Sequence, residues 1–124
     1  YHDRIAALIE AGQPRLLISL HSFTPRLSSL PGEERPWQVG VLYNRDERAA
    51  HIAIPLLEAA GVVTGDNLPY SGKVLNATMN RHGEANGIPY LGLEVRQDLI
   101  ADDAGVAHWC GVLAPVIRAV ADQL

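Results

Sequence analysis

Several features are scarce in this sequence of 124 residues, and each scarcity excludes a class of protein. Cys110 is the single cysteine, so no internal disulfide can form, and we expect a cytoplasmic location. The 10 Lys and Arg residues are scattered and outnumbered by 14 Asp and Glu residues, which argues against binding to nucleic acid or to an acidic membrane. No window approaches the roughly 18 consecutive apolar residues of a membrane span. What is left is a globular chain, 48% hydrophobic and 19% charged, of a length that fits one domain at most.

Short apolar strands alternate with helices along the chain. Apolar periodicity, with glycine and proline as stops, predicts strands over residues 15–20, 37–43 and 88–97. It also predicts helices over 2–12 and 46–60, a short helix within 73–83, and a final helix that starts after Asp102 or Asp103. Polar loops are expected over 21–36 and 65–72. The alternation indicates an α/β domain with a mostly parallel or mixed sheet flanked by helices.

His21 directly follows the first predicted strand, in the stretch "LLISLHSFTP". Open α/β sheets bind ligands outside the carboxyl ends of their strands, so this histidine is expected at the functional edge of the sheet. Taken alone, a histidine here is more often a structural residue than a metal ligand, and both interpretations stay open.

Glu94 lies inside the third predicted strand, "YLGLEVRQDL", on the face opposite Leu91 and Leu93. Because such strands are usually covered on both faces, we expect its carboxylate to be at least half buried. Two interpretations stay open: a structural ion pair with Arg96 on the same face, or a site carboxylate tuned for proton transfer. Glu94 and His21 together are the residue types that hold a Lewis-acidic metal and activate its water.

Four segments and the closing amphipathic helix closely resemble the N-formylglutamate amidohydrolase family, across essentially the whole chain. The segments are "LLISLHSFTP", "RPWQVGVLYNRD", "GDNLPYSG" and "RHGEANGIPYLGLEVRQDLI". More distantly, "SLHS" and "LEVR" are similar to the segments of zinc carboxypeptidases that carry a ligand histidine and the catalytic glutamate. The resemblance implies a zinc-carboxypeptidase-like (phosphorylase/hydrolase-like) fold.

The same resemblance implies a zinc-dependent hydrolase that releases formate from N-formyl-L-glutamate in histidine degradation. His21 would bind the zinc ion, and Glu94 would take a proton from the metal-bound water and return one to the leaving amine. The family's other zinc ligands come from an upstream histidine-x-x-glutamate element, and that spacing does not occur in this sequence. We therefore expect one zinc ion with its remaining ligands in a segment absent here. Residues 1–124 would be a single α/β domain or the C-terminal portion of a longer one.

Substrate-binding residues are expected to be arginines, because N-formylglutamate carries two carboxylates and a guanidinium binds a carboxylate bidentately. Asn44 and Arg45 directly follow the second predicted strand, again at a carboxyl end, and Arg35 lies in the long loop. Arg96 is a further candidate. The alternatives are a helix cap at Asn44 and a solvated arginine at Arg45, and a surface arginine at Arg35.

Two other side chains are candidates for contact with the substrate. His82, in "NRHGE", precedes the strand of Glu94, although a loop histidine often merely faces water. Tyr70, in "GDNLPYSG", offers a phenol to a developing oxyanion, with packing in a proline-bounded turn as the alternative.

Three functions therefore stay open. The first is the zinc-dependent amidohydrolase, whose partner is a small molecule that carries carboxylates. The second is a non-catalytic fragment or binding module of the same fold without a complete metal site. The third is a related hydrolase that acts on another N-acyl amino acid or on a peptide carboxyl end.

Overall fold

A computed structural model describes residues 1–27 and 34–124 of the chain. In chain order its elements are α1 (His2–Gly12), β1 (Leu17–Phe23), β2 (Val39–Leu42), α2 (Arg48–Ala59), β3 (Thr64–Asp66), α3 (Ala77–His82), the 3-10 helix η1 (Glu84–Asn86), β4 (Tyr90–Arg96), the 3-10 helix η2 (Gln97–Ile100) and α4 (Asp103–Gln123). Part of the long loop predicted over residues 21–36 lies outside the described residues.

The strands form one mixed sheet in the order β1-β4-β2-β3. β1 runs parallel to β4, and β2 runs parallel to β3, but β2 is antiparallel to β4. The predicted α/β architecture with a mixed sheet and flanking helices is confirmed. β3 was missed, because a three-residue strand inside a turn-rich stretch carries too little apolar periodicity to be recognised.

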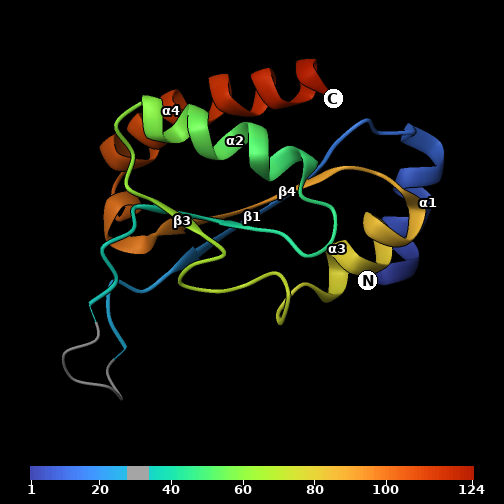
Figure 1. The fold of residues 1–124 in the computed structure, drawn as a ribbon, viewed down its shortest axis with the longest axis horizontal. Coiled ribbons are helices and arrows are strands. Elements are labelled where there is room, and N and C mark those ends of the chain that lie inside the picture. The colour runs from blue at the N-terminus through green and yellow to red at the C-terminus, as the bar shows by residue number, and fades with distance from the viewer. Residues whose placement is uncertain (28–33) are drawn as a thin grey trace.

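The main core lies between one face of the sheet and the helices α2 and α4, which pack against each other on that face (Figure 1). Leu91, Leu93 and Val95 of β4 are buried there beside Leu57 of α2 and Val120 of α4. Alternate residues of a strand point to opposite faces, so the apolar residues of β4 enter this core and Glu94 points away from it.

The opposite face of the sheet is crossed by the loop that follows β3. Gly40 of β2 and Gly65 of β3 lie beneath the carbonyl oxygen of Leu68, where a Cβ on either residue would collide with that oxygen. Glycine at both positions therefore lets the loop lie flat against the sheet. The Asn67 side chain also anchors the loop, because its Oδ1 accepts from the Tyr43 amide at 3.1 Å.

β1 is longer than predicted and extends to Phe23, so His21 lies within the strand rather than after it. The ladder to β4 continues to the pair Phe23 and Arg96, and Phe23 is 2% exposed. Backbone pairing and burial of Phe23 therefore carry the strand past the point where the apolar run stops.

α4 is long and apolar enough to cross a membrane by length and composition alone. One stripe of the helix is buried in the core of the domain, namely Trp109, Leu113, Val116 and Val120. In this fold α4 is a packing helix, and the Asp102 side chain caps its start by accepting from the Gly105 amide at 2.7 Å.

Candidate active site

His21 and Glu94 are direct neighbours across the parallel pair β1 and β4. His21 Nδ1 lies 3.9 Å from Glu94 Oε1, which is longer than a hydrogen bond and within ion-pair distance. Two residues that are 73 positions apart in the sequence thus meet on the sheet face that points away from α2 and α4. An imidazole nitrogen and a carboxylate oxygen so placed can both reach one small ligand.

The carboxyl group of Glu94 is shielded, whereas the imidazole is open to solvent. The side chain of Glu94 is 13% exposed and that of His21 is 67% exposed. Burial raises the pKa of Glu94 above its ordinary value, and the nearby His21 offsets this only in part. A raised pKa makes the carboxylate a stronger base, which favours a role in proton transfer.

The alternative ion pair between Glu94 and Arg96 does not form. Arg96 instead binds Asp98, with Nε donating to Oδ1 at 2.7 Å and Nη2 donating to Oδ2 at 3.2 Å. Arg96 Nη1 also lies 3.4 Å from the carbonyl oxygens of Arg35 and Pro36. Its guanidinium therefore stabilises the end of β4 and the preceding loop, and Glu94 keeps no arginine partner among the described residues.

A cavity of about 720 Å³ opens beside His21 and Glu94. Gly92 lies on the same face of β4 as Glu94, and Tyr70 and Asn76 line the cavity from the segment that crosses this face of the sheet. The cavity therefore combines one acid–base pair with a phenol and an amide, on an otherwise mostly apolar lining.

The described side chains do not by themselves fit a catalytic zinc ion. Such an ion usually takes three protein ligands and a water molecule. Within residues 1–27 and 34–124, no three His, Cys, Asp or Glu side chains come close enough together to hold a metal ion. His21 offers one nitrogen beside Glu94, so a complete zinc site would need ligands from outside these residues.

Arg35 and Tyr70 form a stacked pair next to the cavity. The Arg35 guanidinium lies 5.0 Å from the centroid of the Tyr70 ring, and Nη1 donates to the Tyr70 hydroxyl at 3.1 Å. Arg35 is 7% exposed, so its interpretation as a solvated surface arginine is wrong. Since Tyr70 lines the cavity and Arg35 does not, Arg35 contacts the site through the phenol.

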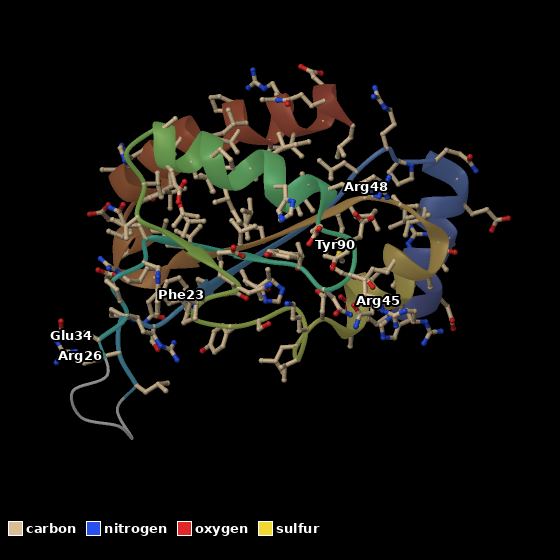
Figure 2. The ribbon with its side chains drawn as sticks, viewed as in Figure 1. Phe23, Arg26, Glu34, Arg45, Arg48 and Tyr90 are labelled. Atoms are coloured by element: carbon tan, nitrogen blue, oxygen red, sulfur yellow. The ribbon has the colours of Figure 1, made fainter. Side chains whose placement is uncertain are left out.

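Asn44 and Arg45 follow the carboxyl end of β2, but that end lies elsewhere than the sequence suggested. Because β2 is antiparallel to β4, its carboxyl end is next to the start of β4. Figure 2 shows Arg45 near Tyr90, the first residue of β4, and far from Phe23, the last residue of β1. Placing Arg45 at the same sheet edge as His21 was therefore wrong, because apolar alternation does not encode strand direction.

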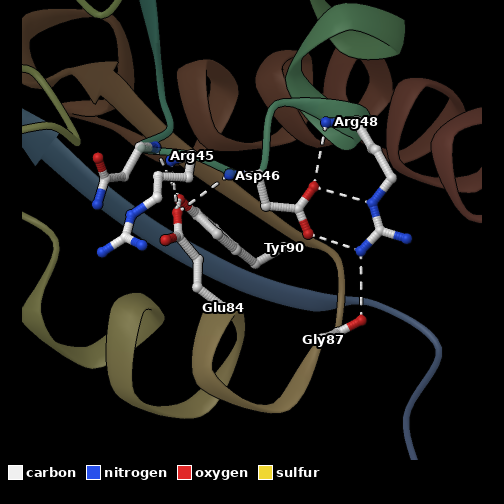
Figure 3. Close-up of polar contacts among 7 residues, drawn as sticks. Arg45, Asp46, Arg48, Glu84, Gly87 and Tyr90 are labelled. Carbon is white, nitrogen blue, oxygen red and sulfur yellow. Dashed lines mark hydrogen bonds and ion pairs between the residues drawn. The ribbon is translucent and has the colours of Figure 1, made fainter.

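Tyr90 is a buried residue beside the site that the sequence patterns did not single out. It lies on the same face of β4 as Glu94, is 1% exposed, and its hydroxyl contacts Glu84, Asn44 and Asn76 at 2.8 Å each. Figure 3 shows how Glu84 and Tyr90 meet the turn after β2. The sequence did contain a signal for Tyr90, because it lies four residues before Glu94 in the predicted strand and residues four apart in a strand share a face.

His82 does not reach the cavity of Glu94 and does not face water. It is 4% exposed, and its Nε2 lies 2.9 Å from Nδ1 of His2 in α1. Burial, together with His2 and Arg81, lowers the pKa of His82. His82 therefore joins α1 to α3 (Ala77–His82) rather than contributing to the candidate active site.

Residues 1–101 match the family model described as N-formylglutamate amidohydrolase. The chain belongs to this family. It is also similar to the crystal structure of the gene product Atu2144 from Agrobacterium tumefaciens, with a TM-score of 0.88 and 26% sequence identity. That similarity covers 99% of this chain and 50% of the other, so this chain spans about half the length of that relative. A comparison with curated proteins gives no match.

The N-formylglutamate amidohydrolase match contains every candidate residue of the site, from His21 to Arg96. It ends just before α4 (Asp103–Gln123), which the structural similarity nevertheless includes almost completely. The family match therefore includes the whole sheet, its site-bearing face and α2, and α4 adds further packing on the face that α2 covers.

Proposed function

We propose that this chain carries the acid–base part of the active site of a zinc-dependent amidohydrolase that releases formate from N-formyl-L-glutamate. The family membership supports hydrolysis of a linear amide. The observation that carries the proposal is the approach of His21 Nδ1 to within 3.9 Å of Glu94 Oε1 at the edge of one cavity. We also propose that the complete site belongs to a zinc-carboxypeptidase-like fold of which this chain is the C-terminal part.

Glu94 would carry the proton transfers of the reaction. As a base it would take a proton from the attacking water, and as an acid it would give that proton to the leaving nitrogen. Its raised pKa suits both steps, because a carboxyl group that is too acidic would not return the proton. Zinc, when bound with His21 as one ligand and other ligands from outside this chain, would supply Lewis acidity toward the formyl oxygen and the water.

Substrate carboxylates would be bound by arginine at the far end of the same sheet face. Tyr90 and Glu94 are four residues apart on β4, which is roughly 13 Å along a strand. Arg45 lines a second cavity together with Asn80 and Glu84, and we propose that its side chain extends from there toward a substrate held at Glu94. Tyr70, held by Arg35, would offer its phenol to the substrate between these ends.

The test is release of formate from N-formyl-L-glutamate, with and without added zinc, by the complete protein that carries this chain, because the other zinc ligands are proposed to lie outside these residues. Glu94→Gln is expected to lower kcat/KM by about 10²- to 10⁴-fold, the usual contribution of a general acid–base residue. His21→Ala is also expected to lower it, because it removes one proposed ligand of the zinc ion. His51→Ala is the matched control, since His51 is an exposed histidine paired with Glu47 on α2. Undiminished turnover of both site variants would remove the proposed mechanism.

A binding module of the same fold is the second candidate, favoured by the lack of a three-ligand metal group among the described residues. It predicts that the chain binds carboxylate-bearing small molecules with no release of formate at any zinc concentration. A panel of N-acyl amino acids and short peptides, offered under the same conditions, separates a formylglutamate hydrolase from one that prefers another acyl group or a peptide carboxyl end.

A further inference from the structure

The hydroxyl of Tyr90 joins three segments that are distant in the sequence. It accepts hydrogen bonds from the Asn44 amide and from Asn76 Nδ2, and it donates one to Glu84 Oε1, each at 2.8 Å. A phenol has one proton to donate and two lone pairs to accept with, so these three bonds use its full capacity. Burial, with a hydrogen bond to Glu84, raises the pKa of Tyr90 to about 12, so the hydroxyl keeps the proton that it donates.

Glu84 extends this contact to the backbone of the turn after β2. Its Oε1 accepts from the amides of Arg45 at 2.8 Å and Asp46 at 3.2 Å, in addition to the Tyr90 hydroxyl (Figure 3). Burial acts to raise the pKa of Glu84, but the hydrogen bonds from Asp46, Tyr90 and Arg45 hold it below its ordinary value. At neutral pH a carboxylate thus binds two consecutive backbone amides, which fixes the direction of the chain at Arg45.

The two arginines of this turn differ in what their side chains do. Arg48 is held by Asp46, with Nε donating to Oδ1 at 2.9 Å and Nη2 to Oδ2 at 2.7 Å, and Nη2 also donates to the Gly87 carbonyl at 3.2 Å. The guanidinium of Arg45 makes no hydrogen bond or ion pair within the described part of the chain. Arg45 is therefore the arginine whose backbone is anchored and whose charge is available to a ligand.

We propose that Glu84 and Tyr90 are positioning residues, which hold the turn 44–46 so that Arg45 can bind a carboxylate of the substrate. This inference rests on the proposed function and adds two residues to its substrate-binding end. The same pair acts on the cavity of Glu94, because Asn76 lines that cavity and gives one amide proton to Tyr90 and another to Asn80 Oδ1 at 2.9 Å.

The first measurement is amide hydrogen exchange at Arg45 and Asp46 in the ligand-free chain. Tyr90→Phe and Glu84→Gln each remove or weaken hydrogen bonds to the turn, so exchange at these amides is expected to rise about tenfold, as for the loss of one net hydrogen bond. Glu47→Gln is the matched control, since it makes the same chemical change at an exposed carboxylate directly after the turn. Unchanged exchange in both variants would overturn the proposal, whatever the ligand.

The second measurement is carboxylate discrimination, read from dissociation constants by NMR titration. The probes are N-formyl-L-glutamate, N-formyl-L-norvaline, which lacks the side-chain carboxylate, and 4-formamidobutanoate, which lacks the α-carboxylate. Arg45→Ala is expected to weaken binding of the probes that carry the carboxylate bound by Arg45 and to leave binding of the probe that lacks it unchanged. The unaffected probe therefore identifies this carboxylate. Tyr90→Phe and Glu84→Gln are expected to weaken binding of the probes that carry this carboxylate about tenfold. The affinity for the probe that lacks it is expected to stay unchanged.

A merely structural role predicts a different result, namely equal weakening for all three probes, and that result would overturn the proposal. If the wild-type chain shows no preference for the dicarboxylate, the proposed function fails at this end of the site, and the role of Glu84 and Tyr90 in fixing the turn is then judged by amide exchange alone. The two failures are distinguishable, because a loss of the proposed function alone still leaves faster exchange at Arg45 and Asp46 in the variants.

Discussion

Glu94 and Asp98 are two carboxyl groups near the same end of β4 that have opposite electrostatic surroundings. Glu94 is shielded by the sheet and its neighbours, and burial raises its pKa. Asp98 accepts two hydrogen bonds from Arg96, and this lowers its pKa. Because His21 offsets the burial of Glu94 only in part, its ionised carboxylate is expected to cost stability, as is typical of groups that serve chemistry.

The Glu94→Gln variant is expected to be more stable than the wild type at pH 7 and about equally stable at pH 3. A raised pKa in the folded state means that the folded protein binds more protons than the unfolded one. Stability therefore falls as the pH rises from the ordinary pKa of glutamate through the raised pKa of Glu94. Glutamine has no such dependence. Urea unfolding at the two pH values measures the difference.

Asp98→Asn is the control, because its expected change in stability at pH 7 has the opposite sign. Its lowered pKa stabilises the fold above the ordinary pKa of aspartate, so the substitution is expected to cost up to ~1 kcal/mol at pH 7 and less at pH 3. If Glu94→Gln instead destabilised the protein at pH 7, the carboxylate would have a stabilising partner that this structure does not contain.

At the scale of single elements, α1 is held to the rest of the fold by few contacts. None of its residues is buried, and its contact with α3 includes the pair His2 and His82. The ring centroids are 5.1 Å apart with 2.9 Å between Nδ1 and Nε2, so the two rings meet nitrogen to nitrogen. One of these nitrogens must be unprotonated to accept the hydrogen bond.

The attachment of α1 is expected to weaken as pH falls from 7.5 to 5. The pKa of His82 is lowered by burial, His2 and Arg81, so the folded state binds fewer protons than the unfolded state and loses stability as pH falls. Amide exchange in residues 2–12 should therefore rise at pH 5 beyond the intrinsic effect of pH. His82→Gln should remove the extra dependence, and His108→Gln, an exposed histidine on α4, should keep it; equal profiles of all three proteins would contradict this role.

Helices and strands could be predicted from the sequence because apolar periodicity is a local pattern. The contacts between these elements could not be predicted in this way. Each of the main strands and helices was recognised from its own apolar spacing, as was the inward face of β4 with Leu91 and Leu93. The direction of β2 was not, because alternation looks the same in parallel and antiparallel strands, and this misplaced Arg45. Likewise the contact between Asn44 and Tyr90 joins residues 46 positions apart, which no sequence spacing reveals.

At the scale of the whole molecule, the layer of helices stops short of the edge strand β1. Ile18 and Leu20 pair in register with Leu91 and Leu93 and so lie on the same sheet face. Yet Ile18 is 44% exposed and Leu20 is 58% exposed, whereas Leu91 and Leu93 are buried. An apolar edge strand with free backbone groups favours association with other chains.

The double substitution Ile18→Thr with Leu20→Thr is therefore expected to reduce self-association of the chain with little change in its free energy of unfolding. Threonine is β-branched and favours strands, and both substitutions remove apolar surface that no helix of the described residues covers. Sedimentation at several protein concentrations measures association, and urea unfolding measures stability. Leu93→Ala, at the register partner of Leu20 on the covered strand, should instead cost about 2–5 kcal/mol, because it empties a buried site. A double variant that associates as strongly as the wild type would show that this chain does not self-associate through the edge of β1.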